Sequence, residues 1–193
     1  MPEPRTVDLW IFDADDTLRR TIVAGQPCPH APGEWELLPG VAERLGTIPW
    51  DDEQGPWFAI ASNQDRVGYG RFSEAVARDL LRELARAATG RTPPDVALQL
   101  CPHRIEEECE CRKPRPRMLR RIMEHYGVPA DRTVFIGDSD GDRLAAAAAG
   151  VHFVPAAEFF SSSGAPSARR SRRTPRRGGA GSYDGGAPRT TRG

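Results

Sequence analysis

The sequence predicts an α/β protein built on a doubly wound parallel sheet of about five strands, with helices on both faces. Apolar runs bounded by turn residues alternate along the chain with helical patterns. Strands separated by helices pair in parallel through right-handed crossovers, and ligands of such sheets lie beyond the carboxyl ends of the strands. Because polar residues directly follow most of the expected strands, we expect one shared site at that edge.

The first part of the chain holds two expected strands and a connecting flap. Residues 7–12 form an apolar run that predicts a buried strand ending in the acidic cluster 13–16. Residues 18–38, rich in Pro and Gly, predict an irregular flap, and residues 40–45 predict a short helix. The run 57–61 predicts the second strand, which leads directly into Ser-Asn-Gln.

A capped amphipathic helix and a cysteine-bearing loop follow. Ser73 is a typical N-cap residue and Gly90 a typical stop signal. The apolar positions between them repeat at helical spacing, at Val76, Leu80, Leu81, Leu84 and Ala87. Residues 96–100 predict a third strand that runs straight into the loop 101–111.

The remaining elements alternate in the same way. Helices are expected over 116–126 and 142–149, and each is followed by a glycine that can end it. Short apolar runs predict strands over 134–136 and 151–154. The five expected strands and their intervening helices complete the predicted sheet.

Composition indicates one globular domain with an uneven distribution of charge. The chain is 38% apolar and carries 27 basic and 27 acidic residues. Residues 161–193 hold eight arginines and one aspartate among Ser, Gly and Pro. We therefore expect a disordered basic tail over 161–193, following a domain over 1–160 that is net acidic.

The sequence gives no sign of a membrane segment. No apolar run reaches the roughly 20 residues that a bilayer span needs, and Met1–Trp10 lacks the basic start and apolar core of a signal peptide. We therefore expect a cytoplasmic protein with no membrane partner. Nothing in the sequence indicates its oligomeric state.

Carboxylates at two strand ends predict metal-assisted chemistry. Asp13 and Asp15 could divide the work, one attacking a substrate and the other handling protons. Asp138 supplies a third carboxylate after another strand. Clustered acids repel one another unless a cation neutralises them, and an all-oxygen site that also meets phosphate suits Mg²⁺.

A calcium loop is the alternative interpretation of the second acidic cluster, because Asp138, Asp140 and Asp142 alternate as calcium ligands do. Arg143 stands where such a loop needs Gly, and Ala149 where it needs the bidentate Glu. Calcium is therefore disfavoured.

Lys113 is the only lysine in the chain, and every other basic residue is an arginine. A compact ammonium differs from a planar guanidinium in how it meets a small anion. Together with the Ser62 hydroxyl and the backbone amides after Asp13, it could hold a phosphoryl group and stabilise the charge that develops during transfer.

The loop that precedes Lys113 contains a set of soft metal ligands: Cys101, His103, Cys109 and Cys111. A Cys₃His set binds Zn²⁺ tetrahedrally and leaves no position for water, so we expect a structural zinc site. Cys28 and His30 repeat the Cys-Pro-His pattern without further partners, and we assign them no role.

These residues resemble the motifs of the haloacid dehalogenase (HAD) superfamily of phosphotransferases. The run 12–18 is similar to the first motif, Ser62 to the second, Lys113 to the third and the run 137–142 to the fourth. The cysteine loop resembles the zinc-loop branch, which contains heptose bisphosphate and histidinol phosphate phosphatases. The resemblance covers roughly residues 7–155 and implies a Rossmann-like HAD fold.

The resemblance implies a role for each matching residue. Asp13 would be the nucleophile that forms an aspartyl-phosphate, and Asp15 the acid and base. Mg²⁺ would be held by Asp13, the main-chain carbonyl of Asp15, and Asp138. Ser62 and Lys113 would bind the phosphoryl oxygens.

The remaining implied roles are supporting ones. Asp142 would orient Lys113 or the metal shell. The residues expected to face the substrate are Asp16, Asn63 and Arg112.

The chain departs from the zinc-loop relatives near the expected substrate. These relatives usually carry Arg where this chain has Ala14, and Gly where it has Asp16; they tend to have Gly and Arg where Arg66 and Tyr69 stand. The stretches between the motifs are too short for a large cap domain, so only the flap and the zinc loop can overhang the site. An open site admits sugar phosphates and also larger phosphate esters.

The leading interpretation is a Mg²⁺-dependent phosphatase that hydrolyses a small phosphorylated substrate, such as a sugar phosphate or an amino-alcohol phosphate. A nucleic-acid end phosphatase is an alternative, because arginines of the basic tail could bind the phosphates of a nucleic-acid backbone. A zinc-stabilised binding module without catalysis is a second alternative.

Overall fold

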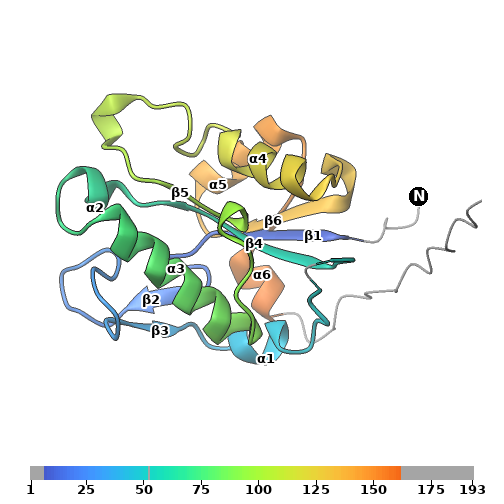
Figure 1. Cartoon of the computed structure of the whole chain (residues 1–193), viewed down its shortest axis with the longest axis horizontal. Coiled ribbons are helices and arrows are strands. Elements are labelled where there is room, and N and C mark those ends of the chain that lie inside the picture. Colours follow the sequence, from blue (N-terminus) through green and yellow to red (C-terminus); the bar gives the residue numbers. More distant parts are fainter. Residues whose placement is uncertain (1–6, 52, 162–193) are drawn as a thin grey trace, which may run out of the picture.

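The computed structural model describes residues 7–51 and 53–161, so the disordered tail expected over 161–193 falls almost wholly outside the described residues. Its centre is a parallel sheet of five strands, which confirms the predicted fold class (Figure 1). The strands run across the sheet in the order β5 (Leu98–Cys101), β4 (Trp57–Asn63), β1 (Leu9–Phe12), β6 (Thr133–Gly137) and β7 (His152–Pro155).

Helices cover both faces of this sheet. On one face, α1 (Val41–Leu45), α3 (Glu74–Thr89) and α6 (Ala156–Ser161) pack against strand residues such as Phe12 and Ile60. On the other face, α4 (Arg117–Tyr126) and α5 (Asp140–Ala149) pack against residues such as Ile11 and Phe135. Alternate residues of β1 therefore enter two different cores, as the period of two in a strand requires.

Helix α3 begins and ends where its sequence signals lie. The Ser73 hydroxyl accepts a hydrogen bond from the backbone N–H of Val76, and Gly90 closes the helix in the left-handed conformation with φ 73°. Its buried residues, among them Leu81 and Leu84, form the stripe that packs on the sheet. The predicted cap and stop of this helix are confirmed, and so is the burial of its three leucines, but Val76 is only half-buried and Ala87 is exposed.

The flap expected to be irregular over 18–38 contains a short antiparallel hairpin, so that part of the prediction is wrong. Strand β2 (Arg19–Thr21) pairs with β3 (Trp35–Leu37). The sequence of β2 is Arg-Arg-Thr and contains no apolar residue, so no alternation of apolar and polar residues indicates a strand. The hairpin is fixed instead by tertiary contacts, because Trp35 and Leu37 pack against the main core.

Several other boundaries shift; the first strand begins at Leu9, and the second extends to Asn63. The strand expected over 96–100 begins at Leu98, because Asp95–Ala97 form a 3₁₀ turn after a proline. Helix α5 begins at Asp140 rather than at 142, since the Ser139 hydroxyl accepts a hydrogen bond from the backbone N–H of Asp142 and so caps the helix earlier.

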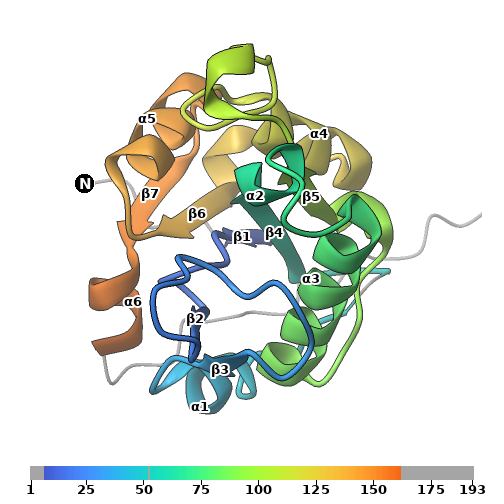
Figure 2. The same cartoon turned by 90° about the vertical axis from the view of Figure 1, so that its left-hand side faces the viewer.

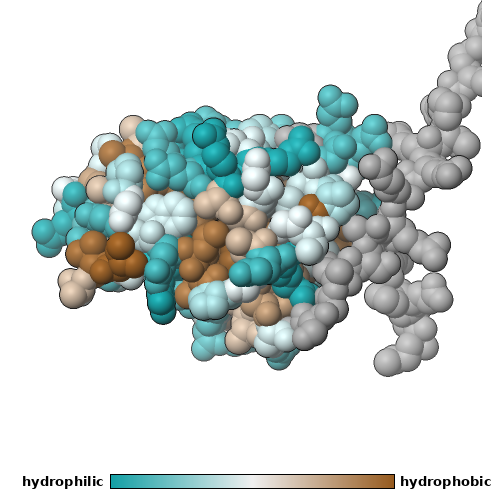
Figure 3. All heavy atoms as spheres, turned by 90° about the horizontal axis from the view of Figure 1, so that it is seen from below, coloured by the Kyte–Doolittle hydropathy of each residue, from teal (hydrophilic) through white to brown (hydrophobic). Residues whose placement is uncertain are grey.

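The remaining short elements are α2 (Asp65–Gly68), which follows β4, and 3₁₀ turns at Ile105–Glu107 and Ala130–Arg132. Figure 2 looks toward the carboxyl ends of the strands, where the flap, α2 and the loop between β5 and α4 surround the end of the sheet. Seen from below, hydrophobic side chains show through a largely hydrophilic surface (Figure 3). None of the helices in the described ranges combines the length and apolarity that crossing a bilayer requires.

The core predicts a clear contrast between two leucines. Leu81 of α3 is 0% exposed and Leu144 of α5 is 46% exposed. We expect Leu81→Ala to lower the free energy of unfolding by about 2–5 kcal/mol, because it opens a cavity between α3 and the sheet. Leu144→Ala should change it by less than about 0.5 kcal/mol. Urea denaturation followed by circular dichroism measures both, and equal losses would contradict this assignment of the core.

Candidate active site

The ammonium of Lys113 lies buried between two carboxylates. Its Nζ is 2.5 Å from Asp13 Oδ1 and 2.6 Å from Asp142 Oδ1, and it donates a hydrogen bond of 2.8 Å to the carbonyl oxygen of Ala61. Asp13 directly follows β1, Ala61 lies in β4, and Asp142 lies in the first turn of α5. Three neighbouring elements thus converge on one cation that is only 6% exposed.

The backbone of Lys113 is held by Asn63 at the end of β4. The Asn63 Oδ1 accepts a hydrogen bond of 3.0 Å from the Lys113 N–H, and its Nδ2 donates one of 3.2 Å to the Lys113 carbonyl. Both polar groups of the amide are therefore used to fix this residue. The lysine side chain leaves the loop from a defined position.

Acidic groups outnumber cations at this end of the sheet. Carboxylate oxygens of Asp13, Asp138 and Asp142 all lie within 4.8 Å of one another. The Thr17 hydroxyl donates a hydrogen bond of 3.2 Å to Asp138 Oδ1. With Lys113 as the ammonium in contact with two of these three acids, an all-oxygen group of this charge fits a hard divalent cation such as Mg²⁺.

The ionisation of these groups reflects their burial and the excess of negative charge around them. Burial raises the pKa of Asp13 to about 7; Asp142 adds to this shift, and Lys113 opposes it. Burial and the charge of Asp142 also raise the pKa of Asp138. Burial alone would lower the pKa of Lys113, but its two carboxylate neighbours outweigh that effect and raise it. An added cation would favour the ionised carboxylates.

Asp15 lies in different surroundings from Asp13. Its Oδ1 accepts a hydrogen bond of 2.9 Å from Arg19 Nε, and its Oδ2 accepts one of 2.7 Å from Gln64 Nε2. The same Gln64 amide donates a hydrogen bond of 2.9 Å to the Ser62 hydroxyl. The carboxylate of Asp15 thus lies outside the acidic group described above, and only its main-chain carbonyl remains as the metal contact that the resemblance implies.

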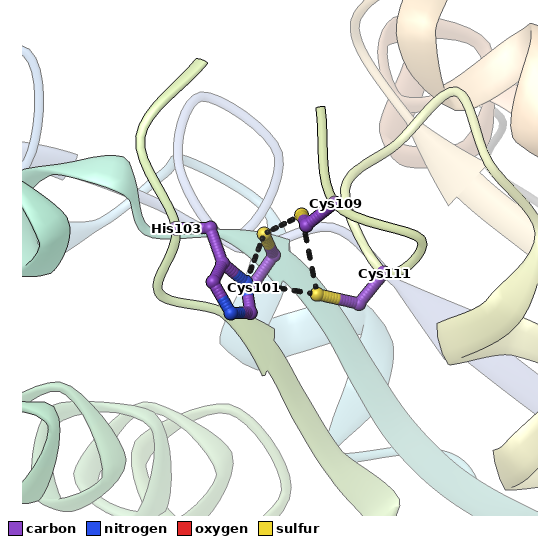
Figure 4. A group of neighbouring side chains, drawn as sticks. All are labelled: Cys101, His103, Cys109 and Cys111. Carbon is purple, nitrogen blue, oxygen red and sulfur yellow. Dashed lines mark hydrogen bonds between the residues drawn. The ribbon is translucent and has the colours of Figure 1, made fainter. Parts of the chain in front are cut away.

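A second group of ligand atoms lies at the end of β5 and on the loop between β5 and α4 (Figure 4). Cys101 Sγ is 3.6 Å from His103 Nδ1 and 3.4 Å from Cys109 Sγ. Cys111 Sγ is 3.5 Å from Cys109 Sγ and 3.2 Å from His103 Nδ1. None of these cysteines forms a disulfide.

The spacing of these four atoms suits a tetrahedral metal. Bonds of about 2.3 Å to sulfur and 2.0 Å to nitrogen place neighbouring ligand atoms roughly 3.5–3.8 Å apart around zinc. The distances of 3.2–3.6 Å are close to this range. Burial raises the pKa of the Cys101 thiol, so its ionised form needs a cation nearby.

Several known proteins are similar to this chain. A family model described as HAD-hydrolase-like matches residues 110–157. Over 119 residues the chain is 38% identical to the D-glycero-beta-D-manno-heptose-1,7-bisphosphate 7-phosphatase of Pseudomonas aeruginosa, covering 60% of this chain and 63% of that protein. It is 33% identical over 121 residues to the protein of the same name from Bordetella bronchiseptica, covering 62% and 65%.

Solved structures share the fold. The D,D-heptose 1,7-bisphosphate phosphatase from B. bronchiseptica, crystallised with magnesium and phosphate, has a TM-score of 0.60 and 28% identity, covering 85% of this chain and 91% of that one. The chain belongs to the HAD superfamily. A HAD-like phosphatase from Mesorhizobium loti, with a TM-score of 0.57, 21% identity and coverage of 77% and 71%, has the same fold. The alignments with the two curated relatives span a little less than two thirds of their lengths.

Three residues expected to face a substrate of this HAD protein are placed differently from one another. Asp16 is exposed and left-handed, with φ 60°, a conformation that glycine adopts at least cost. The Asn63 amide makes two hydrogen bonds to the backbone of Lys113. Arg112 lies 3.5 Å from Asp65 at the start of α2. Substrate contacts of these residues stay a prediction.

Helix α2 and the cysteine loop pack together beside the HAD site. Arg104 Nε donates a hydrogen bond of 2.7 Å to the Gly68 carbonyl, and the Tyr69 hydroxyl donates to Glu106 at 2.9 Å. A Cβ on Gly68 would lie 2.8 Å from the Arg104 nitrogen, so only glycine allows this approach. The loop and α2 thus lie side by side at the carboxyl end of the sheet (Figure 2).

Two residues that sequence reasoning missed are Arg19 and Gln64. Both are buried, and both contact the Asp15 carboxylate. Gln64 carried a usable signal, because it follows Ser62 and Asn63 at the strand end. Arg19 carried none, since Arg20 beside it has the same side chain and is exposed.

The position of Asp142 depends on a glycine at the end of β6. A Cβ on Gly137 would lie 2.6 Å from Asp142 Cβ and 2.7 Å from its Cγ, whereas one on Gly141 would meet only Ser139 Oγ at 3.6 Å. The Asp142 Oδ2 also accepts a hydrogen bond of 2.6 Å from the Ser139 hydroxyl, so the side chain cannot move away freely.

We expect Gly137→Ala to lower the free energy of unfolding by about 1–3 kcal/mol through overpacking against Asp142. Gly141→Ala should be neutral or slightly stabilising, because alanine favours a helix over glycine. Chemical denaturation of the two variants measures the difference. A Gly137→Ala chain as stable as the unmodified one would mean that Asp142 does not occupy this position.

Proposed function

We propose that this HAD protein is a Mg²⁺-dependent phosphatase that hydrolyses a small phosphate monoester, with sugar phosphates as the first candidates. The observation that carries the proposal is the Lys113 ammonium buried between Asp13 and Asp142, with Asp138 close by. The names of the matched relatives, which are sugar bisphosphate phosphatases, support this substrate class.

The proposed reaction uses two aspartates in turn. A carboxylate oxygen of Asp13 attacks phosphorus, and the bond from phosphorus to the leaving oxygen of the ester breaks. Asp15 donates its proton to this leaving oxygen. Asp15 then takes a proton from a water molecule that attacks the aspartyl-phosphate, which releases inorganic phosphate and restores both residues. The net change is hydrolysis of the ester by one water.

Lys113 and Ser62 would bind the phosphoryl oxygens during both steps. Lys113 already contacts the Asp13 carboxylate, so its charge lies where the transferred group must bond. The Ser62 hydroxyl is held by Gln64 at the end of the neighbouring strand. Fixed donors of this kind stabilise the charge of the transition state without reorganisation.

Mg²⁺ would be held by the side chains of Asp13 and Asp138 and by the main-chain carbonyl of Asp15. When bound, the ion would neutralise charge on the phosphoryl group and the carboxylates. Asp142 would contribute indirectly, through Lys113 and through its own charge. The excess of carboxylates over ammonium supports this assignment.

Phosphate release from a panel of substrates tests the proposal. The panel holds sugar phosphates, histidinol phosphate and 3′- or 5′-phosphorylated oligonucleotides, each with and without Mg²⁺. We expect Mg²⁺-dependent hydrolysis of a small ester by the unmodified chain, and a loss of at least about 1,000-fold in Asp13→Asn, because an amide cannot replace the nucleophile.

Asp140→Asn is the matched control, because Asp140 lies on the same edge but is exposed and pairs with Arg143. It should retain most of the activity. Preferential hydrolysis of oligonucleotides, falling steeply with salt, would favour the nucleic-acid end phosphatase instead. No hydrolysis of any ester with Mg²⁺ would favour the binding module.

We further propose that the cysteine loop holds one structural Zn²⁺ through Cys101, His103, Cys109 and Cys111. We expect about one zinc per purified chain by elemental analysis. Cys109→Ser should lose most of this metal and lower the melting temperature. Cys28→Ser is the control, since Cys28 lies in the flap, and it should keep its zinc. A metal-free chain of unchanged stability would contradict the proposal.

A further inference from the structure

Arg19 is a buried arginine in the flap, and the proposed mechanism gives it no role. Arg19 of β2 is 0% exposed. Its Nε pairs with Asp15 Oδ1 at 2.9 Å, and its Nη1 donates a hydrogen bond of 3.4 Å to the Leu80 carbonyl in α3. Its guanidinium carbon lies 5.9 Å from the centre of the Trp35 ring. Within the described part of the chain, Nη2 is buried without a hydrogen-bond partner.

Stability alone is a poor explanation for this arrangement. Removing a guanidinium from water costs several kcal/mol, and a buried ion pair recovers that cost only with full hydrogen bonding. Arg19 leaves one nitrogen unsatisfied, and its partner Asp15 is a proposed catalytic residue rather than a structural one. The arrangement is therefore better explained by what it does to Asp15.

We propose that Arg19 is a positioning residue that, together with Gln64, fixes the Asp15 carboxyl group in the orientation needed for proton transfer. This inference rests on the proposed phosphatase function and deepens it. Arg19 touches neither the phosphoryl group nor the nucleophile in this assignment, and acts only through Asp15.

The geometry leaves Asp15 able to exchange a proton. A carboxylate has about four lone-pair directions. Arg19 occupies one on Oδ1 and Gln64 occupies one on Oδ2, so each oxygen keeps another direction free. Two donors on opposite oxygens also stop the group from rotating, and a catalytic group misplaced by about 1 Å can lose 100-fold in rate.

The anchoring of Arg19 links this effect to the flap. Leu80 belongs to α3 and Trp35 to the other strand of the hairpin, so the guanidinium joins the flap to the main domain. The next residue, Arg20, points the other way: its side chain is 56% exposed and pairs with Glu36. The register of a three-residue strand therefore decides which arginine reaches Asp15.

The test compares esters that differ in their need for an acid. An alkyl phosphate needs a proton on its leaving oxygen, whereas p-nitrophenyl phosphate does not. For Arg19→Met, whose side chain is similar in length but uncharged, we expect kcat on the alkyl ester to fall about 100-fold. KM should change by less than roughly threefold, because phosphate binding is untouched.

With p-nitrophenyl phosphate the two halves of the reaction separate. Arg19→Met should release about one equivalent of nitrophenolate per chain in a burst as fast as that of the unmodified protein. Turnover should then be slow, because hydrolysis of the aspartyl-phosphate requires Asp15 to activate a water molecule. A residue that only stabilised the fold would lower the burst and both rates together.

Arg20→Met is the matched control in the same strand, and it should behave as the unmodified chain does on both esters. If Arg19→Met does not fold, Arg19→Lys serves instead. A lysine keeps the charge but cannot reach Asp15 and Leu80 together, so we expect about a 10-fold loss on the alkyl ester with the burst retained.

Unchanged kcat on the alkyl ester in the folded Arg19 variant, or an equal loss on both esters with a smaller burst, would overturn the inference. Failure of the unmodified chain to hydrolyse either ester with Mg²⁺ would instead overturn the proposed function. The two failures are thus distinguishable in one set of measurements.

Discussion

The site depends on one buried ammonium that must be matched by carboxylates. A lysine removed from water is tolerated only when opposite charges and hydrogen bonds replace its hydration, and Asp13, Asp142 and the Ala61 carbonyl supply these for Lys113. Each of these groups comes from a different strand or helix. The requirement that they meet at one nitrogen therefore fixes how β1, β4 and α5 are placed at the edge of the sheet.

Several local features hold Asp142 and Lys113 in these positions. The Ser139 cap starts α5 so that Asp142 lies in its first turn, and Gly137 leaves room for the carboxylate. Asn63 fixes the backbone of Lys113, and Cys111 stands two residues before it. Neighbouring aspartates then acquire unlike surroundings: Asp13 meets Lys113, and Asp15 meets Arg19. Different environments are how two carboxyl groups of one site take different chemical roles.

The sequence predicted the parts of the fold that local rules control. Strand and helix patterns, the cap at Ser73 and the stop at Gly90 depend on neighbours in the chain. The structure has these elements in the expected order, with some boundaries shifted, and the cap and stop at the expected residues. The carboxylates, Lys113 and the cysteine loop were found because strand ends in a parallel sheet share an edge. Their chemical roles stay predictions.

What the sequence did not reveal depends on register and on distant partners. The hairpin of β2 and β3 has no apolar alternation, so nothing distinguished Arg19 from Arg20. The pairing of Asn63 with the backbone of a residue 50 positions away was not predicted either. A pairing of this kind is a property of the folded chain and has no local signal.

The order of these groups along the chain also bears on how the protein folds. Asp13 and Lys113 are 100 positions apart, and β1, at the middle of the sheet, pairs with strands that follow it much later. Parallel pairings across such separations form slowly, because the entropy of closing long loops is lost before the contacts form. The unpaired edges of β1 remain open to other chains during this time. The appearance of activity during refolding would therefore measure the formation of these long-range strand pairings, which follows the formation of the local helices.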